Sequence, residues 1–553
     1  MNALIVLLPA LPALSALAIQ LFASPRGQCA PRLSTGFGLA AFLLALAWLG
    51  LSLAGTTLDG LGLALDPLAA LMATLISGIG QIVRLYSRRY MAEEAGYRRF
   101  YVLLDVMIAT LLVMVAADNL LVLLAAWHGV GVLLYFLLGL DTASRPAHRY
   151  ALWTFFTYRV GDLPLLLAAV LLYQAFGTWS LSALFAAIDA QPDITTVFGL
   201  PLVDTVAALV ALSAFARSAQ FLMHTWLPYT MSGPTPVSAL MHAGIVNAGG
   251  FLLNRFAPVL VHTSEVLHWI FLVGLVTAVV GSVLMLAQND IKKSLGYSTM
   301  GQMGFMIMEV GVGAFSLAVY HLIAHGFFKG TLFLGAGGVI GEARHNDGVP
   351  ANDLYTFVVE RRPAPRAQSW LVMVGLSLVL PIAVLVAAHG AVAAELFHQQ
   401  GAIVLLFFGW LAGAQLVFST HRMQSEQPWR LFMLVLVSFV LVVMGYVLIS
   451  HAFDLFLYPD AAFRERINEA AGIDLVWFDV LVGVLTVVIV AGWVRAYRTE
   501  RDVLAGRVRP TPPLWRDFYA LVSREFYVAD VYAGLARALL AVSGRLDLWL
   551  RWL

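Results

Sequence analysis

Residues 216–250 read ARSAQFLMHTWLPYTMSGPTPVSALMHAGIVNAGG, and the rest of the chain is interpreted from this stretch. It places Arg217, His224 and His242 in sequence that is otherwise apolar enough to cross a membrane. The stretch also contains residues that break a helix, namely Pro228, Gly233, Pro234 and Pro236. Ionisable groups are costly in lipid and usually face a protein interior or a wet path, and a broken helix at membrane depth needs buried partners or water for its freed carbonyls. The stretch therefore predicts an ion site built on a broken membrane helix.

The composition identifies the protein class. The chain has 553 residues, of which 61% are hydrophobic and 12% are charged, and its mean hydropathy is +0.84. Soluble domains carry roughly 25% charged residues, so this composition predicts an all-α polytopic membrane protein that is embedded in the lipid bilayer. The net charge of +1 argues against nucleic acid as a partner. The single Cys29 excludes an intramolecular disulfide and a metal site built from cysteines.

Apolar segments of about 20 residues, the length that crosses a bilayer, recur along the whole chain. They lie near 2–22, 35–54, 63–84, 101–116, 119–140, 151–173, 199–222, 236–260, 265–287, 296–315, 318–341, 368–388, 400–419, 430–452 and 474–496. A last segment near 525–546, interrupted by Arg537 and Arg545, either spans the bilayer or lies along its interface. The pattern predicts about 15–16 transmembrane helices and no soluble domain. Residues 1–22 lack a basic start and precede further spans, so they indicate a first transmembrane helix rather than a cleaved signal.

The loops predict the orientation. Alternate loops are rich in arginine and lysine, for example 88–99, 145–149 and 292–293, whereas 55–62, 174–198 and 389–399 are poor in both. The exception is 453–473, where two arginines are balanced by acids. Because positive loops stay in the cytoplasm, we expect the N-terminus to lie outside.

The first group of ionisable residues at membrane depth lies before the broken helix. Asp105 and Asp118 flank the fourth and fifth spans, and His128 follows in AAWHGVGVLLYF. Arg159 and Asp162 stand at i, i+3 in TYRVGDLPLLL, close enough on one helix face to pair. This pair either locks two helices together or tunes a proton site nearby, and both roles are compatible.

The residues around the break have a similar ambiguity. Arg217 stays protonated, so it sets the charge around its neighbours or holds a water chain, unless it snorkels to the interface. His224 and His242 titrate near neutrality and suit proton transfer, although a lone core histidine is more often simply hydrogen-bonded. Because three ionisable groups surround one break, we favour the proton path over that structural interpretation.

The second group lies in AVYHLIAHGFFKGTLFLGAGGVI, where His321, His325 and Lys329 are spaced by four residues. This spacing stacks them on one helix face, so that two imidazoles lead to a lysine able to exchange a proton when buried. A metal site and a purely structural stripe remain alternatives, although no carboxylate joins that face. Glu309, in the middle of the preceding span, is a weaker candidate. No phosphate loop, dinucleotide fingerprint or haem-attachment motif is present, so the sequence predicts ion translocation, with the proton as the favoured ion, and no enzymatic chemistry or cofactor on this chain.

Five segments resemble the antiporter-like membrane subunits of respiratory complex I and of Mrp antiporters. They are LLVLLAAWHGVGVLLYFLLG, TYRVGD, GPTPVSALMHAG, DIKKSLGYSTMGQMGFM and HLIAHGFFKGTLFLGAGGVI, and the match covers residues 60–345. The resemblance implies two inverted five-helix repeats, each with a broken helix, joined by a central polar axis. It divides the chain into N-terminal helices (1–100), a first repeat (101–260), a second repeat (265–420) and C-terminal helices that contact a partner (430–553).

The resemblance also implies roles for individual residues. The positions that match the family's central proton-relay residues are His242, His321, His325 and Lys329, and Arg159 with Asp162 matches its motif pair. Other positions depart from the family pattern. His128 replaces the glutamate of a W-E-G motif, Arg217 replaces the lysine of an A-K-S-A-Q motif, and no lysine stands near Pro381. The C-terminus is too short for the long lateral helix of complex I.

These departures favour one branch of the family, the membrane subunits of the DAB complexes that accumulate inorganic carbon in the inner membrane of bacteria. In that branch the partner, DabA, resembles a zinc carbonic anhydrase on the cytoplasmic side. The resemblance implies that this chain conducts H+ or Na+ and that zinc and CO2 hydration belong to the partner, since this chain has no carbonic anhydrase ligand set. Two alternatives stay open: a proton-pumping subunit of a complex I-like or hydrogenase-like oxidoreductase, and a structural membrane anchor.

Overall fold

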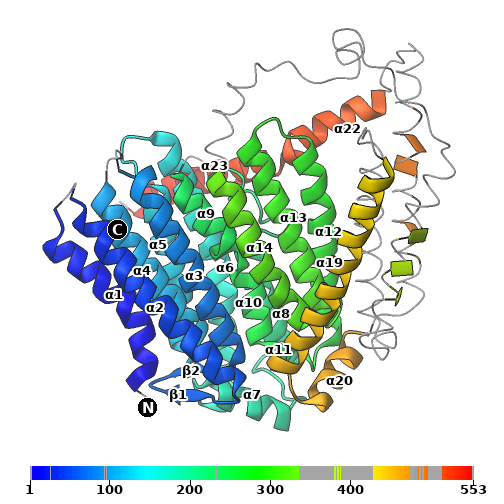
Figure 1. Cartoon of the computed structure of the whole chain (residues 1–553), viewed down its shortest axis with the longest axis horizontal. Helices are drawn as coiled ribbons and strands as arrows, with labels where there is room; N and C mark the ends of the chain where they lie inside the picture. Colours follow the sequence, from blue (N-terminus) through cyan, green and yellow to red (C-terminus); the bar gives the residue numbers. More distant parts are fainter. Residues whose placement is uncertain are drawn as a thin grey trace.

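The computed structural model describes residues 3–335, 428–472 and 513–550, except 25–26, 93, 95 and 231–232, together with isolated positions between 379 and 498. Within this part the protein is a bundle of helices, and the strands form one short hairpin (Figure 1). The predicted spans near 368–388, 400–419 and 474–496, with the expected break at Pro381, lie almost entirely outside the described residues. The described residues contain 11 helices long and apolar enough to cross a membrane. The fold is therefore that of an all-α polytopic membrane protein, as predicted, while the total helix count and the repeat boundaries remain predictions.

The long helices run along the bundle. They are α1 (Ala3–Phe22), α2 (Cys29–Leu53), α3 (Pro67–Tyr90), α4 (Tyr97–Ala116), α5 (Leu120–Leu138), α6 (Arg145–Phe176), α8 (Leu202–Arg217), α12 (Ser264–Leu286), α13 (Ile291–Gly311), α14 (Phe315–Gly335) and α19 (Pro428–Leu457). Shorter helices are α7 (Leu181–Ala190), α9 (Thr235–Ala243), α10 (Ala248–Arg255), α11 (Ala257–Leu260), α20 (Ala461–Ala470), α22 (Pro513–Ser523) and α23 (Val528–Leu550). Strands β1 (Leu58–Gly60) and β2 (Leu63–Leu65) pair antiparallel, with Leu58 opposite Leu65.

Polar residues in the turns define where the helices begin. Asp66 accepts a hydrogen bond from the amide of Ala69 and Pro67 is the first residue of α3, which is a favourable helix start. Asn119 and Ser144 cap α5 and α6 in the same way. These caps satisfy amides that have no partner within the helix.

The loops divide the bundle into two ends. The arginine- and lysine-rich loops that follow α1, α3, α5 and α12 lie together, and we call this the basic end. The N-terminus, the hairpin, α7 and α20 lie at the opposite end (Figure 1). The alternation of charge read from the sequence therefore agrees with the path of the chain, and the placement of the N-terminus outside the cell remains a prediction.

The predicted break is present between Arg217 and His242. Helix α8 ends at Arg217, residues 218–229 lie mostly in turns, and α9 begins only at Thr235. Leu222 adopts a left-handed backbone conformation with φ of 74°, which is strained for a residue with a side chain. Groups of the break find partners elsewhere in the bundle: the amide of Phe221 donates to the Thr277 hydroxyl on α12, and the Ser218 hydroxyl donates to the Val246 carbonyl. The break is thus held by the surrounding helices, as membrane depth requires.

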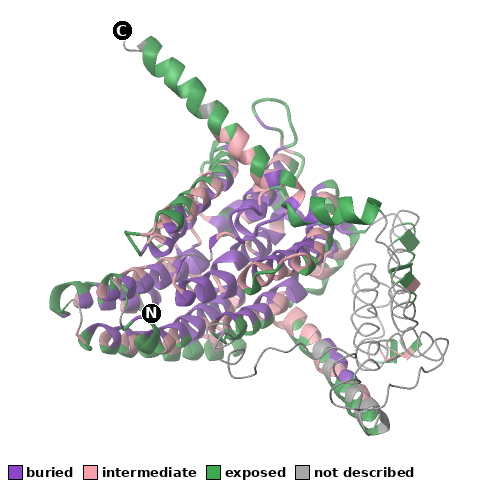
Figure 2. Ribbon diagram, turned by 90° about the horizontal axis from the view of Figure 1, so that it is seen from above, coloured by how far each residue is buried: buried purple, intermediate pink, exposed green. Residues whose placement is uncertain are grey.

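The C-terminal helices lie across the basic end of the bundle. Helix α23 runs across the long helices in Figure 1, and in Figure 2 it projects past them as an exposed arm. Of the two alternatives predicted for the segment near 525–546, its position across the bundle end favours the one in which it lies along the interface. Among the described residues of this C-terminal arm (α22 and α23), only Val522, Glu525 and Val528 are buried, so most of its surface is exposed.

The arm is fastened to the broken helix. Glu525, Phe526 and Tyr527 all have left-handed φ values, 56°, 55° and 58°, which turn the chain sharply between α22 and α23. This turn buries the Glu525 carboxylate, which accepts a hydrogen bond at 2.9 Å from the hydroxyl of Tyr229. The hydroxyl of Tyr532 donates to the Leu222 carbonyl at 2.5 Å. The C-terminal segment thus contacts the break 296 residues earlier in the chain.

Candidate ion-translocation site

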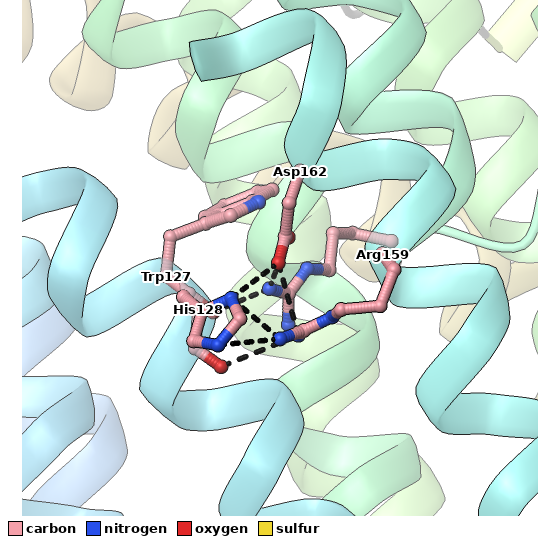
Figure 3. A network of polar contacts seen from close by, with 5 residues as sticks. Trp127, His128, Arg159 and Asp162 are labelled. Carbon is pink, nitrogen blue, oxygen red and sulfur yellow. Dashed lines mark hydrogen bonds and ion pairs between the residues drawn. The ribbon is translucent and has the colours of Figure 1, made fainter. Parts of the chain in front are cut away.

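The first polar cluster joins three helices around one carboxylate (Figure 3). Asp162 on α6 lies 3.0 Å from Nη2 of Arg217 at the end of α8 and 2.9 Å from Nη2 of Arg159 one turn away. It also lies 3.0 Å from Nδ1 of His128 on α5. The structure therefore confirms the predicted contact between Arg159 and Asp162 and adds Arg217 as a second cation on the same carboxylate.

Arg217 is the most firmly held member of this cluster. Its side chain is 1% exposed, and one guanidinium nitrogen donates to the carbonyl of Trp127. The guanidinium lies 4.1 Å from the ring centre of Tyr158 and 4.6 Å from that of Trp127, distances at which aromatic faces attract a cation. Arg217 does not snorkel to the interface, because these contacts hold it inside the protein.

The opposite side of the cluster reaches the surface of the bundle. The His128 side chain is 55% exposed and that of Arg159 is 20% exposed. The guanidinium of Arg159 packs directly on the imidazole, with Nη1 2.7 Å from Nε2 of His128. Gly131 permits this approach, because a Cβ atom at that position would lie 2.5 Å from Nη2 of Arg159. The cluster therefore extends from a dry interior to the outer surface of α5 and α6.

We expect Asp162→Asn to destabilise the protein, because it leaves two neighbouring guanidiniums without their carboxylate. Charged hydrogen bonds of this kind are worth about 1.5–3 kcal/mol. The measurement is the thermal unfolding midpoint of the purified protein in detergent. Asp193→Asn is the matched control, since that aspartate lies exposed in a loop at the opposite end from the basic loops. Equal midpoints for the two variants would contradict a structural role for the ion pair.

His224 lies within the break, as predicted, and is fully buried. Its ring stacks on Phe221 at 5.7 Å and tilts toward Tyr297 at 6.4 Å. In the chain it lies between Arg217 of the first cluster and Tyr229, which contacts the C-terminal arm.

The second polar cluster lies between α9, α13 and α14. Nδ1 of His321 lies 3.1 Å from the carboxylate of Glu309, and its Nε2 lies 2.8 Å from the Gln302 amide oxygen. At the other end of the stripe, Nζ of Lys329 donates to the hydroxyl of Ser298 at 2.7 Å. The four-residue spacing does place His321, His325 and Lys329 along one helix, with the last two almost completely buried.

His242 joins this cluster from the facing helix. It is fully buried, stacks on Phe333 at 4.1 Å, and lies close enough to Lys329 to interact with its charge. His325 in turn interacts electrostatically with His321, Lys329 and His242. The structure therefore gathers four of the sequence-predicted residues into one group.

The histidines at the centre of these groups lack fixed partners. Within the part of the chain that the structure describes, neither ring nitrogen of His224, His242 or His325 has a hydrogen-bond partner. Buried polar groups are normally satisfied by protein or by ordered water. These imidazoles therefore need water as a hydrogen-bond partner, and a proton can be exchanged with such a water. This favours a proton path over a purely structural stripe.

Sequence reasoning missed several polar residues of the second cluster. Ser298 and Gln302 stand four residues apart on α13, so the sequence spacing already placed both side chains on one helix face. Glu309 was ranked as a weak candidate and turns out to be a direct partner of His321. The alternative of a metal site gains no support, since no group of three or more histidine, cysteine, aspartate or glutamate residues suited to a metal occurs among the described residues.

The two clusters are separate. No hydrogen bond or ion pair between them is found in the described ranges, although His224 and Tyr297 lie between their helices. Any charge that moves from one cluster to the other must therefore cross on water or by side-chain motion.

Comparison with known proteins agrees with this arrangement. The family described as NADH:quinone oxidoreductase/Mrp antiporter matches residues 117–413, and that of the complex I chain 5 N-terminus matches residues 54–101. The probable inorganic carbon transporter subunit DabB1 of Halothiobacillus neapolitanus is 56% identical over 560 residues, covering 99% of each chain. The chain belongs to the DabB branch of the antiporter-like membrane subunits. The resemblance drawn from the sequence motifs is confirmed.

Other relatives of this DabB-branch chain match less of it. Subunit 5 of the chloroplast NAD(P)H-quinone oxidoreductase of Piper cenocladum is 39% identical over 280 residues, which cover 50% of this chain and 38% of that protein. The chain thus spans less than half the length of that relative. Among solved structures, the Mrp complex from Dietzia sp. is 25% identical with a TM-score of 0.54, covering 97% of this chain and 61% of the other. An archaeal membrane-bound sulfane sulfur reductase, 17% identical with a TM-score of 0.58 over 84% of this chain and 99% of the other, shares the fold.

Proposed function

We propose that this chain conducts protons, or Na+, through the bacterial inner membrane as the membrane subunit of a complex that accumulates inorganic carbon. The observation that carries the transport proposal is the second cluster. Buried imidazoles without fixed partners stand between Glu309 at one end and Lys329 at the other. An imidazole that lacks fixed partners can take up and release a proton without breaking a protein hydrogen bond.

The first cluster supports a different role within the same function. Its carboxylate is shared by two guanidiniums, and arginine does not give up its proton. We therefore assign Asp162, Arg159 and Arg217 to holding the broken helix and to setting the electrostatic potential near His224. His128 extends this cluster to the outer face of the bundle.

The inorganic-carbon assignment rests on the similarity to DabB1, whose name describes an inorganic carbon transporter subunit. We propose that the basic end faces the cytoplasm and that ions move inward through this chain. A DabA-like, zinc-containing partner resembling a carbonic anhydrase would bind at that end, where the exposed arm α22–α23 lies. Zinc and the hydration of CO2 to bicarbonate then belong to the partner, and this chain supplies the coupled ion flow.

A second candidate is a proton-pumping subunit of a complex I-type oxidoreductase. The similarity to chloroplast NAD(P)H-quinone oxidoreductase subunit 5 over half of this chain favours it. The two candidates differ in their partners, because an oxidoreductase requires iron–sulfur and quinone-binding subunits.

The test is to purify the tagged chain from its native membranes and to analyse the stable partner for zinc and iron. We expect a zinc-containing partner with the fold of a carbonic anhydrase, and uptake of labelled inorganic carbon that collapses when an ionophore removes the proton and sodium gradients. Iron–sulfur subunits in the purified complex would favour the oxidoreductase. Uptake that persists without an ion gradient would contradict the proposed coupling.

A further inference from the structure

A pocket of about 210 Å³, lined by both polar and apolar side chains, lies at the end of the bundle opposite the basic end. Its walls come from the start of α3, the turn before α5, and α7, α10, α11 and the end of α19. The polar side chains that line it are Asp66, Asp118, Ser182, Asn254, Arg255 and Tyr458. A volume of this size has room for several water molecules.

The pocket carries a net negative charge, from two carboxylates and one guanidinium. Asp66 is 34% exposed and pairs with Arg255, while Asp118 accepts hydrogen bonds from the hydroxyls of Ser180 and Ser182. Arg255 is 10% exposed, and its Nε has no partner among the residues that the structure describes. A buried donor on the wall of a polar pocket indicates water inside it, and a net negative, hydrated cleft concentrates small cations.

The floor of this pocket leads toward the second cluster. Tyr458 donates a hydrogen bond to Asn254 at 3.1 Å. One helical turn before Tyr458 stands the half-buried Asp454. This turn of α19 packs on the first residues of α14, where Phe315 meets Tyr458 at 6.3 Å and Tyr320 meets Phe453 at 5.7 Å. His321 lies on α14, about 8 Å along the helix axis from its first residues. Asp454 is therefore the carboxylate that stands between the pocket and the pair formed by Glu309 and His321.

We infer that this pocket is the outer mouth of the ion path, that it takes a small hydrated monovalent cation, and that Asp454 passes charge from it toward His321. The inference rests on the proposed function, because it assumes inward ion flow. For a proton, Asp454 accepts H+ from water in the pocket and releases it to water or to the Glu309–His321 pair, so that no co-reactant is needed. If the pocket had a structural role alone, its carboxylates would act solely as helix caps. Chemical modification inside the pocket would then leave transport unchanged.

The test uses the full complex with Cys29→Ala as the background, since Cys29 is the single cysteine of the chain. Ser182→Cys places a thiol in the pocket, and Val197→Cys places one on the same end outside it, at a residue that is 76% exposed. Spheroplasts, whose outer membrane no longer blocks access, are treated with two membrane-impermeant methanethiosulfonate reagents, one cationic and one anionic. We expect the cationic reagent to react severalfold faster than the anionic one at Ser182→Cys, with a smaller preference at Val197→Cys.

Transport is measured on the same samples. We expect complete modification at Ser182→Cys to reduce inorganic-carbon uptake at least tenfold and modification at Val197→Cys to leave it unchanged. Asp454→Asn should lower uptake to the same degree while the labelling rates at Ser182→Cys stay as before, which shows that the pocket has kept its structure. No labelling from outside, equal rates for both reagents, or normal uptake after complete modification would each overturn the inference. The labelling rates do not depend on transport. A wild-type complex that takes up no inorganic carbon would therefore refute the proposed function, and the labelling rates would still test the pocket separately.

Discussion

Lys329→Ala is expected to abolish ion-driven uptake of inorganic carbon while the protein still assembles in the membrane. Lys329 is 1% exposed, donates to Ser298, and lies close enough to the imidazoles of His242 and His325 to interact with them. Its removal takes away the amine at the end of the imidazole stripe. The Lys329 ammonium must first release its own proton and then, as a neutral amine, accept one from His325, so in the variant a proton on His325 has no further acceptor on this helix. Because its hydrogen-bond partner is a hydroxyl and not a carboxylate, the variant leaves no buried counter-charge, and we expect a stability loss of about 1–3 kcal/mol.

Lys329→Arg distinguishes charge from proton exchange. Arginine keeps the positive charge and does not release its proton, so we expect this variant to be as inactive as Lys329→Ala. Lys292→Ala is the matched control, because Lys292 lies half-buried at the basic end, outside the stripe. Uptake is measured in cells whose growth depends on it, with membrane levels of each variant determined in parallel. Normal uptake in Lys329→Ala would refute the role of the stripe and leave the membrane-anchor hypothesis in its place.

Asp105→Ala is expected to prevent stable folding. Asp105 on α4 is fully buried and lies 2.8 Å from Nη2 of Arg84 on α3. Its two oxygens also accept hydrogen bonds from Ser15 on α1 at 2.6 Å and Ser34 on α2 at 2.8 Å. One carboxylate thus ties four helices together. Removing it leaves an arginine that is 1% exposed without a counter-charge, and breaking such a pair costs about 3–5 kcal/mol.

The measurement is the amount of folded protein in the membrane and its unfolding midpoint in detergent. Asp118→Ala serves as the control, because Asp118 accepts its hydrogen bonds from serines at the partly exposed end of the bundle and not from a buried cation. The double variant Arg84→Leu with Asp105→Leu should recover much of the loss, since a buried ion pair replaced by apolar side chains of similar size is often neutral. A stable Asp105→Ala protein would show that the ion pair does not hold these helices.

Some relations could be predicted from the sequence because they depend on local helix geometry alone. Arg159 and Asp162 stand three residues apart, and that spacing brings them together on any α-helix. His321, His325 and Lys329 share a face for the same reason. The prolines and glycine after His224 predicted the break, because they prevent the helix from continuing.

Other relations join residues that are far apart in the chain, and no spacing rule reports them. Asp162 meets Arg217 across 55 residues, and Glu525 meets Tyr229 across 296. The position of the C-terminal arm stayed open between spanning and interfacial for this reason: its hydropathy resembles that of a span, and contacts with the break hold it across the bundle end. Asp105 was recognised as a costly residue, but its partners on three other helices could not be named.

The sequence by itself determined the membrane class, the alternation of basic loops, the broken helix, the titratable stripe and the family. Each of these follows from hydropathy, from the 3.6-residue helical period or from short motifs, all of which act over a few residues. Tertiary structure alone decided which charges share a partner, which of the described imidazoles stay without one, and that a pocket opens at the end opposite the basic end. Those outcomes depend on how the helices pack against one another, because a buried charge is stabilised by whichever helix faces it and not by its neighbours in the chain.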